Sequence, residues 1–515
     1  MPDYKTSLWA ATSPPPPRPP LQQDTTVDVA VVGAGITGIT AAYLLKQAGL
    51  RVAVLESRRV GSGETKRTTA HLTEVLDLRF RRLRTHFGRD GARLALEGHR
   101  AAIDQIESLT GALQMDCDFA RVGGYLVAET KGEVDELEEE VAAARDLGLS
   151  ASLVDTIPLP LRVARALMVE RQAQFHPRVY LDALAERVDG GGSQIFETTH
   201  VQSIEDGAPC RVVTERGVVT AKAVIVASGV PVSNQVFIHL KLAAYRTYAV
   251  AVKQAAPVSP GLVWDMKDPY HYVRGQVVDG VPYLIIGGED HKVGESDDTT
   301  VPFERLEAYA RERLGVEVAP TDLRWAGQII EPADGLPYVG RNSLSKHLFV
   351  ATGYAGNGIT GGTWAAMVLA DQVRGIENRW SALLDATRLK PLAAGPAVAS
   401  ENVDYPKHLI ADRLLPLGHR GQLEQIPAGE GAVLSVHGTK LAVYRNAEGV
   451  LSGLSPVCPH MGCFVHWNNA EKSWDCPCHG SRFDTQGRVL NGPAVSPLEH
   501  RDVPADEGPP PASST

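Results

Sequence analysis

Apolar runs near the start of the chain alternate with a helical pattern. Val27 to Val32 is a short apolar run that predicts a strand, and Ile39 to Ala48 follows with the period of a helix. A second apolar run, Arg51 to Leu55, ends at Glu56. A strand, a helix and a strand in this order are typical of a βαβ unit in a parallel sheet. The pattern therefore predicts an α/β fold for the first part of the chain.

Later segments of the chain predict further strands and an outer helix. Tyr245–Val252 and Tyr283–Gly287 are strand-like, and Gly132 to Asp146 is predicted to be a solvated outer helix. From Gly421 onwards, short strands alternate with turns, which favours a small antiparallel barrel. These last strands are expected at Ala432–Val436, Leu441–Arg445 and Val450–Leu454.

Length and composition set the domain plan. A chain of 515 residues is too long for the small barrel alone, so a large domain must precede it. Residues 391–419, which begin rich in Pro, Ala and Gly, are predicted to be a linker to a domain at 420–507. The Pro-rich residues 1–25 are expected to form a disordered, extended tail without a helix, and residues 508–515 a second disordered tail.

Charge and hydropathy exclude some partners. The net charge of −10 without a polybasic block argues against nucleic acid. No apolar run is long enough to span a membrane, and the first 21 residues lack the apolar core of a secretory signal. We therefore expect a cytoplasmic protein. Cys117 and Cys210 stand apart from the other cysteines and are expected to be buried free thiols.

A glycine-rich turn follows the first strand. Gly33, Gly35 and Gly38 give the pattern G-x-G-x-x-G between strand and helix, and Glu56 follows about twenty residues later. Such glycines let a pyrophosphate approach a helix N-terminus, and the acid accepts ribose hydroxyls. The alternative is a glycine-rich turn without a ligand. The chain has one such unit, so a second dinucleotide site for a nicotinamide electron donor is not expected, and electrons should enter from an organic substrate.

Two short motifs near the C-terminus each supply one Cys and one His. They are Cys458-x-His460 and Cys476-x-x-His479, both in loops rich in Gly and Pro. Two thiolates on one iron and two imidazoles on the other form the ligand set of a Rieske 2Fe–2S centre. A zinc site is the rival, but zinc fingers usually separate their Cys pair from their His pair. The spacing therefore predicts a one-electron redox centre.

The two loops resemble those of respiratory Rieske proteins. By this resemblance, Cys463 and Cys478 form a disulfide that joins the loops, and Ser481 donates a hydrogen bond to a bridging sulfide. Those proteins typically carry a Tyr two residues after this Ser, whereas this chain has Phe483. Loss of a donor to a cysteine sulfur favours the oxidised cluster, so the resemblance implies a lower reduction potential.

The larger part of the chain, about residues 26 to 390, resembles the D-amino-acid oxidase family of FAD-dependent oxidoreductases, which includes glycine and sarcosine oxidases. The resemblance rests on the first βαβ unit, the loop Gly61 to His71, the strand Ala223 to Gly229 and the block Asp334 to Thr360. It implies a Rossmann-like FAD-binding domain from about residues 26–105, 166–234 and 321–390. It also implies an antiparallel-sheet substrate domain from about residues 106–165 and 235–320.

The same resemblance supplies the FAD-binding residues. The turn before the last helix, Gly356 to Thr360, is expected to approach the flavin through backbone N–H groups, which would stabilise the anionic reduced flavin. The full predicted set is Gly33, Gly35, Ile36, Thr37, Gly38, Glu56, Ser57, Arg67, Thr68, Thr69, Val201, Ser228, Gly229, Gly335, Gly356, Asn357, Gly358, Ile359 and Thr360. No Cys stands where a relative with covalent flavin carries one, so non-covalent FAD is expected.

Residues near the substrate are harder to identify from sequence. The catalytic candidates are Tyr354, Arg246, Tyr245 and His71, with Tyr248, Tyr272 and Trp325 also candidates for facing the substrate. Arg246 pairs with a substrate carboxylate in one interpretation and forms a structural ion pair in the other. His71 is either an ordinary core histidine, a residue near the flavin or its covalent attachment point.

Three functions remain open. The first is oxidation of a C–N bond in an amine or amino acid, with electrons passed from FAD to the cluster and then to an external acceptor. The second is an oxidase that uses O2 directly while the cluster is structural or regulatory. The third is an electron carrier or redox sensor without a small-molecule substrate.

Overall fold

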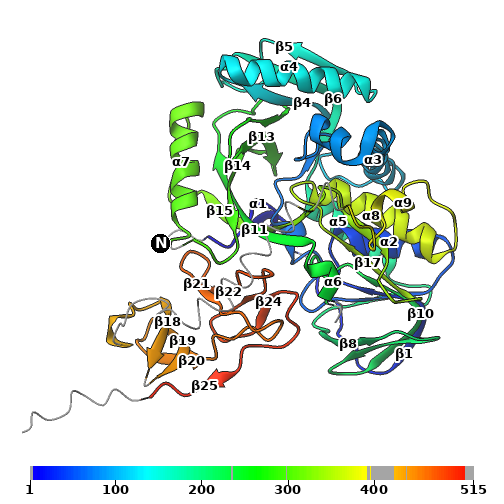
Figure 1. The fold of residues 1–515 in the computed structure, drawn as a ribbon, viewed down its shortest axis with the longest axis vertical. Helices are drawn as coiled ribbons and strands as arrows, with labels where there is room; N and C mark the ends of the chain where they lie inside the picture. Colours follow the sequence, from blue (N-terminus) through cyan, green and yellow to red (C-terminus); the bar gives the residue numbers. More distant parts are fainter. Residues whose placement is uncertain are drawn as a thin grey trace, which may run out of the picture. The chain divides into compact units, whose positions relative to one another are not determined.

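The structure, a computed structural model, describes residues 4–504 except 15, 233–235, 297, 391–394, 396–422 and 437. The chain forms two compact units, Met1–His291 with Val301–Ala399, and Lys292–Thr300 with Ser400–Thr515. Figure 1 shows the path of the chain through both units. Apart from residue 395, the predicted linker 391–419 lies outside the described residues, as does the tail 508–515. None of the described helices has the length and apolar character needed to cross a bilayer.

The first unit contains a largely parallel sheet in the order β16-β17-β10-β1-β2-β7, with β8 and β9 joined at β10. β1 pairs in parallel with both β2 and β10, and α2 forms the crossover between β1 and β2. The strands are β1 Thr25–Val32, β2 Val52–Leu55, β7 Gln194–Phe196, β8 Val201–Glu205, β9 Cys210–Thr214, β10 Val218–Val226, β16 Tyr338–Arg341 and β17 Leu348–Thr352. This confirms the predicted α/β fold.

Several helices belong to this part of the unit, and α2 packs against both α5 and α8. They are α2 Ile36–Gln47, η1 Glu64–Lys66, α3 Phe80–Ala112, α5 Pro177–Val188, α6 Val236–His239, α8 Gly358–Val373 and α9 Ser381–Leu384. α2 begins three residues earlier than predicted, because Gly35 is its N-cap and the rest of the glycine turn is already helical. α3 is interrupted at Gly88, whose φ of 71° is not helical.

The second sheet of the unit runs in the order β15-β11-β14-β13-β12-β4-β6-β3, with β5 paired to β6. Its elements are β3 His71–Leu72, β4 Ala120–Ala128, α4 Lys131–Asp146, β5 Ala151–Val154, β6 Arg165–Gln174, β11 Leu242–Lys253, β12 Leu262–Trp264, β13 His271–Val278, β14 Val281–Lys292, α7 Val301–Leu314 and β15 Leu323–Pro332. The sheet extends past the expected ranges 106–165 and 235–320. It takes in β3, β6 and β15, because the long ladders β4–β6 and β11–β15 place those strands here.

The two faces of this sheet carry different side chains. On β11, Tyr248 packs edge-on against Phe303 of α7, with ring centroids 4.9 Å apart. On β13, His271 stacks on Tyr309 of the same helix at 4.1 Å. Residues next to these in sequence point to the opposite face, because side chains alternate along a strand. Thr247 therefore lies on the face away from α7, where its hydroxyl bonds the hydroxyl of Tyr272 at 2.8 Å.

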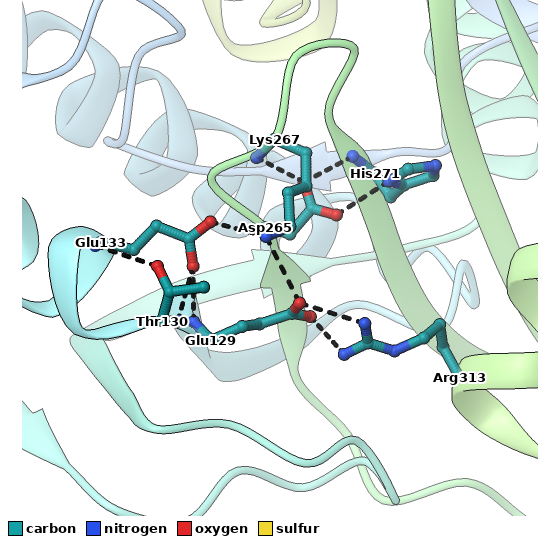
Figure 2. A network of polar contacts seen from close by, with 7 residues as sticks. All are labelled: Glu129, Thr130, Glu133, Asp265, Lys267, His271 and Arg313. Carbon is teal, nitrogen blue, oxygen red and sulfur yellow. Dashed lines mark hydrogen bonds and ion pairs between the residues drawn. The ribbon is translucent and has the colours of Figure 1, made fainter.

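A polar network fixes the hairpin between β12 and β13. Figure 2 shows its members, Glu129, Thr130, Glu133, Asp265, Lys267, His271 and Arg313. Lys267 donates to Glu133 at 2.6 Å, and Asp265 accepts from both the backbone N–H and the ring Nδ1 of His271. Burial opposes protonation of His271, but the hydrogen bond and charge of Asp265 raise its pKa overall. The network therefore links α4, α7 and the hairpin that carries Tyr270 and Tyr272.

The N-terminal segment differs from the extended tail that the sequence predicted. Leu8–Thr12 forms a short helix, α1, which begins after Ser7, and Leu8 and Trp9 are fully buried. The Trp9 indole N–H donates to the carbonyl of Thr68 at 2.6 Å. The prediction of a tail without a helix is therefore wrong here. The prolines that follow suggested an extended chain, but the two apolar side chains before them gain stability by burial in the first unit.

The second unit is built from two small antiparallel sheets, β18-β19-β20-β25 and β21-β22-β23-β24. Its elements are η3 Leu423–Gln425, β18 Gly431–Val436, β19 Thr439–Arg445, β20 Leu451–Leu454, β21 His466–Asn468, β22 Ser473–Asp475, β23 Arg482–Phe483, β24 Val489–Asn491 and β25 His500–Arg501. Three of these strands match the predicted ones closely, because short alternating runs between turns are a clear signal.

The segment between β14 and α7, residues 292–300, is counted with this second unit. The Thr299 hydroxyl bonds Asn468 and Asn469, each at 2.7 Å, and His466 Nδ1 lies 2.6 Å from the carbonyl oxygen of Gly294. Gly294 has a φ of +75°, and a Cβ there would lie 3.0 Å from the backbone nitrogen of Pro477. This segment therefore packs directly against the loop that holds Cys476 and His479.

We expect the substitution Trp9→Ala to lower the free energy of unfolding by about 3 kcal/mol, because it removes a fully buried indole. It also removes the donor to Thr68, so flavin retention should fall. Thermal unfolding and the flavin-to-protein ratio measure the two effects. Trp9→Phe keeps an aromatic ring and loses only the N–H, so its unfolding temperature should lie between those of the wild type and Trp9→Ala. Unchanged values for Trp9→Ala would show that the buried Trp9 contributes neither to the stability of the fold nor to flavin retention.

We expect Gly294→Ala to perturb the second ligand loop, because its Cβ would meet the backbone of Pro477. Gly449→Ala is a matched control, since Gly449 also has positive φ but nothing lies within 4 Å of its added Cβ. The measurement is iron content with the visible circular dichroism of the purified protein. Iron content should fall in Gly294→Ala and stay near wild type in Gly449→Ala. Equal values in both variants would contradict the close packing.

Candidate functional site

The glycine turn is built by close backbone contacts. Gly33 has a φ of +104°, and a Cβ there would lie 2.6 Å from the carbonyl oxygen of Ala227. A Cβ on Gly38 would lie 1.9 Å from the carbonyl oxygen of Gly33. Neither position tolerates a side chain. The turn therefore delivers the chain tightly into α2, as a dinucleotide site requires.

The start of α2 and the end of β2 form the rest of this site. Glu56 accepts hydrogen bonds from the backbone N–H groups of Ala34 and Arg58, each at 2.9 Å. The N-cap Gly35 offers no side chain to the first turn of α2, and Ile36 N–H donates to the hydroxyl of Thr65 at 3.0 Å. The uncapped helix start and the fixed carboxylate fit a pyrophosphate and a ribose. Thr65 was not among the predicted residues, since its contact with α2 is not visible in sequence.

The start of α8 offers a second uncapped helix end. Asn357 is its N-cap, but the side chain donates to the carbonyl of Val75 at 3.2 Å and makes no capping bond. The backbone N–H of Gly356 donates to Asp77 at 2.6 Å. The first N–H groups of any helix have no partner within it. The segment Gly358–Thr360 therefore presents donors of the kind that a flavin pyrimidine ring accepts.

Three buried side chains hold the loop that carries Thr68 and Thr69. Trp325 donates from its indole to the carbonyl of Arg67 at 2.7 Å, while Trp9 holds the carbonyl of Thr68. Arg274 donates to the carbonyl of Thr69 at 2.6 Å. Burial lowers the pKa of Arg274 to about 9. Neither Trp9 nor Arg274 was predicted, because each comes from a segment far from the loop in sequence.

The other predicted flavin residues lie at the edges of the same sheet. Val201 begins β8, and Gly229 follows β10 with a φ of +82° and accepts a bond from the Thr352 hydroxyl at 2.7 Å. The Ser228 hydroxyl donates to the carbonyl of Val230, and Gly335 has a φ of +92°. The Ser57 hydroxyl donates to Glu56 at 3.3 Å. Their contact with FAD stays a prediction.

His71 lies in an aromatic group on the sheet face away from α7. Its ring centroid is 5.6 Å from that of Tyr272 and 5.7 Å from that of Trp264. Nδ1 lies 3.1 Å from the hydroxyl of Thr69. Burial and the charge of Arg274 hold the pKa of His71 well below its usual value, so the imidazole is neutral. This places His71 beside the loop expected at the flavin.

The remaining catalytic candidates do not gather at one point. Tyr245 shares a strand face with Thr247, whereas Arg246 is fully buried on the alternate face with Tyr248. Tyr354 accepts a hydrogen bond from the Thr37 hydroxyl at 3.0 Å, and burial raises the pKa of Tyr354. Tyr354 therefore faces the start of α2. Roles for these residues in catalysis stay predictions, and the side of the sheet that Arg246 occupies does not favour a bond to a substrate carboxylate near His71.

In the second unit, the two ligand loops have the same backbone pattern. Gly462 donates to the carbonyl of Cys458, and Gly480 donates to that of Cys476, both at 3.0 Å. Both glycines have positive φ, near 80° and 75°. Cys463 and Cys478 form a disulfide with their Cα atoms 6.5 Å apart. The disulfide that the resemblance implied is therefore present and joins the two loops.

The four predicted ligands face each other in two pairs. The rings of His460 and His479 have centroids 5.0 Å apart. The thiol of Cys476 donates to Cys458, which lowers the pKa of Cys458 and raises that of Cys476. Backbone N–H groups and the Ser481 hydroxyl also lower the pKa of Cys458. N–H groups that point at a cysteine sulfur stabilise its thiolate, the form that binds iron.

This arrangement fits a two-iron cluster. In the described part of the chain, no three His, Cys, Asp or Glu side chains converge as ligands of a single ion. A Rieske centre does not need such convergence, because each iron takes only two protein ligands and the sulfides complete the rest. Phe483 is fully buried beside the cluster loops and pairs with Trp474 across β22 and β23. The thiols of Cys117 and Cys210 are buried and unbridged, as predicted.

Comparison with known families places both domains. Residues 28–372 match the family described as DAO, FAD dependent oxidoreductase. Residues 418–502 match the Rieske [2Fe-2S] domain. YhfW of Bacillus subtilis (strain 168), named as a Rieske 2Fe-2S iron-sulfur protein, is 34% identical over 500 residues, which cover 96% of this chain and 97% of that protein.

Other relatives cover single domains. Gamma-glutamylputrescine oxidoreductase of Escherichia coli (strain K12) is 26% identical over 74% of this chain and 92% of its own. A cytochrome b6-f complex iron-sulfur subunit of Chlorobaculum tepidum is 34% identical over 17% of this chain and 48% of its own. Among solved structures, glycine oxidase from Geobacillus kaustophilus has the same fold, with a TM-score of 0.61 and 23% identity over 71% of this chain and 99% of its own.

These matches confirm the resemblances that the motifs indicated. The first unit has the fold and the family signature of an FAD-binding oxidoreductase, and the second has the family signature of a Rieske domain. The cofactors are therefore FAD and a 2Fe–2S cluster. The chain belongs to the DAO family of FAD dependent oxidoreductases, as a member that also carries a C-terminal Rieske domain.

Proposed function

We propose that this oxidoreductase oxidises a C–N bond in an amine or amino acid and passes the electrons to its Rieske cluster and then to an external acceptor. One observation carries the proposal: a single chain holds a flavin-binding oxidoreductase and a complete Cys2His2 cluster set. Bound FAD supplies a two-electron acceptor for a hydride from the substrate carbon, and the cluster supplies a one-electron carrier. The oxidised C–N bond is an imine, which water hydrolyses to a carbonyl compound and either ammonia, from a primary amine, or an amine, from a secondary one.

Support for C–N chemistry comes from the relatives. Gamma-glutamylputrescine oxidoreductase and the solved glycine oxidase are named for an amine and an amino acid. The relative named as a Rieske 2Fe-2S iron-sulfur protein is 34% identical over 96% of this chain, so its similarity extends over both domains. Fusion on one chain raises the effective concentration of the cluster as an acceptor.

The chain's own residues hold and orient the two groups. Glu56 would accept the ribose hydroxyls of bound FAD, and the N–H donors at the start of α8 would stabilise negative charge on the reduced flavin. Arg274 and Trp9 fix the loop Arg67 to Thr69, which is expected beside the flavin. In the second unit, Cys458 and Cys476 would hold one iron, and His460 and His479 the other.

The first test separates the cluster from the flavin. We expect His460→Ala and His479→Ala to leave anaerobic flavin reduction by an active amine within about twofold of wild type. Reduction of a one-electron acceptor such as cytochrome c should fall at least 100-fold, because each variant removes an iron ligand. His500→Ala, an exposed histidine of the same domain, is the control and should behave as wild type.

Three measurements decide between the alternatives: flavin absorbance, acceptor reduction and hydrogen peroxide yield in air. Acceptor reduction that survives in the ligand variants would contradict the proposed route through the cluster. Full peroxide yield with no acceptor reduction in the wild type would favour the oxidase instead. A flavin that stays oxidised with every amine and amino acid offered would contradict C–N oxidation and favour an electron carrier.

A second prediction concerns the cluster potential. We expect Phe483→Tyr to raise the midpoint potential by on the order of 50 mV, because a hydroxyl donor to a ligand sulfur stabilises the reduced cluster by about 1 kcal/mol. Ser481→Ala should shift it in the opposite direction, because it removes a hydroxyl that bonds Cys458. A redox titration followed by electron paramagnetic resonance measures both. Shifts in the same direction would contradict this account of the sulfur hydrogen bonds.

A further inference from the structure

Asp290 is a buried carboxylate that no part of the predicted chemistry uses. It lies near the end of β14, and both of its carboxylate oxygens are buried. The neighbouring Thr247 side chain lowers its pKa through a hydrogen bond but supplies no counter-charge. Its neighbour Glu289 has partners on the other face of the sheet, where it bonds His271 and Arg305. Asp290 instead belongs with Thr247 and Tyr272, on the face that carries His71.

The charges that act most strongly on Asp290 are negative. Burial raises the pKa of Asp290 to about 7, and the negative charges of nearby acids raise it further. These acids are Asp77, Glu331 and Glu289. The hydrogen bond with the Thr247 side chain has the opposite effect and lowers the pKa. No cation is among these strongest influences from the described residues. Burial of an ionised carboxylate without a counter-charge raises the free energy of the folded chain. A positively charged ligand beside Asp290 would therefore stabilise the ionised carboxylate.

Aromatic rings stand beside this carboxylate. The ring centroids of Tyr270 and Tyr272 are 5.6 Å apart, and Tyr272 lies edge-on to His71 at 5.6 Å. His71 is neutral, since burial keeps its pKa low, so it does not repel a cation. The faces of aromatic rings attract ammonium groups, most strongly where water is excluded. The buried carboxylate of Asp290 and the neighbouring aromatic rings therefore both favour a cationic ligand.

The acidic and aromatic residues around Asp290 lie next to Gly356, in the turn expected at the flavin. A Cβ on Gly356 would lie 2.7 Å from Asp77 Oδ2 and 3.0 Å from the Tyr270 hydroxyl. The arginines that would recognise a carboxylate are used elsewhere. Arg274 bonds the carbonyls of Thr69 and Phe175, and Arg246 occupies the opposite face of β11. A substrate carboxylate beside Asp290 would be repelled by the negative charges of Asp77, Glu289 and Glu331.

We propose that Asp290, with Tyr270 and Tyr272, binds a positively charged group of the substrate at a distance from the C–N bond that is oxidised. The substrate class is then a diamine or longer polyamine and not an α-amino acid with a single amine. This inference rests on the proposed C–N oxidation and specifies the substrate of that same site. Asp290 is a specificity residue here, because it holds the remote ammonium group and takes no part in hydride transfer.

The test compares three compounds with the same four-carbon chain: diaminobutane, butylamine and γ-aminobutyrate. With the FAD-loaded full chain, we expect diaminobutane to bind at least tenfold more tightly than butylamine, and γ-aminobutyrate to bind more weakly still. Binding is read from the perturbation of the oxidised flavin spectrum under anaerobic conditions before reduction, and the reduction rate is recorded separately. Asp290→Asn should abolish the preference for the diamine.

Glu289→Gln is the matched control, because Glu289 is the adjacent acid on the same strand but faces away from Thr247 and Tyr272. It should keep the diamine preference. Equal binding of diamine and monoamine by the wild type, or an unchanged preference in Asp290→Asn, would overturn the inference. If the diamine binds selectively through Asp290 but never reduces the flavin, the binding site stands and the proposed oxidation fails.

A stability measurement shows whether Asp290→Asn is folded and whether the carboxylate is unpaired. The pKa of Asp290 is raised from 3.8 to about 7 in the folded chain, so ionisation destabilises the fold as the pH rises through this window. Asn does not ionise, so the variant lacks this pH-dependent loss of stability. We therefore expect the melting temperature of Asp290→Asn, relative to wild type, to increase between about pH 5 and pH 8 in the absence of amine. A relative decrease would show that Asp290 has a counter-charge and would overturn the proposal.

Discussion

The close packing of α2 against α8 is the constraint on which the first unit depends. A Cβ on Gly362 of α8 would lie 2.6 Å from the Thr37 hydroxyl of α2. That hydroxyl in turn donates to Tyr354, just before α8. Small residues therefore let two helices begin side by side. Each helix start has N–H groups without a partner inside the helix and a partial positive charge, and together they suit the two ends of a dinucleotide flavin.

The second determinant is a set of buried bonds between segments that are remote in sequence. Arg274 comes from β13, Trp9 from α1 and Trp325 from β15, yet all three hold carbonyls of the loop from Arg67 to Thr69. The Arg274 guanidinium also lies over the Trp9 ring, 5.3 Å from its centroid. A loop with so many buried partners is held in one conformation. This is how a short segment beside a cofactor can be rigid although it forms no regular element.

Side chains alternate between the two faces of the second sheet, so charged residues that pair with each other lie on one face and those without a counter-charge lie on the other. On one face of the second sheet, His271, Glu289 and Arg305 satisfy each other and tie the sheet to α7. On the other face, buried Asp290 has no cation among the strongest influences on it, and Nε2 of His71 has no hydrogen-bond partner among the described residues. Natural proteins seldom bury unpaired groups except where a ligand completes them. The cluster unit follows a different rule, because its ligands are paired by two loops of identical backbone pattern joined by a disulfide.

The sequence by itself determined the parts whose chemistry is local. The glycines around Gly33, the acid Glu56 and the four cluster ligands sit at fixed short spacings, and backbone geometry within a few residues specifies what they can do. Only the tertiary structure decided which face Arg246 occupies, where Tyr354 points and that α1 is buried. It also brought Asp290, Thr247 and Tyr272 together. These depend on sheet register and on the packing of segments hundreds of residues apart, and no local pattern of apolar and polar residues encodes such long-range contacts.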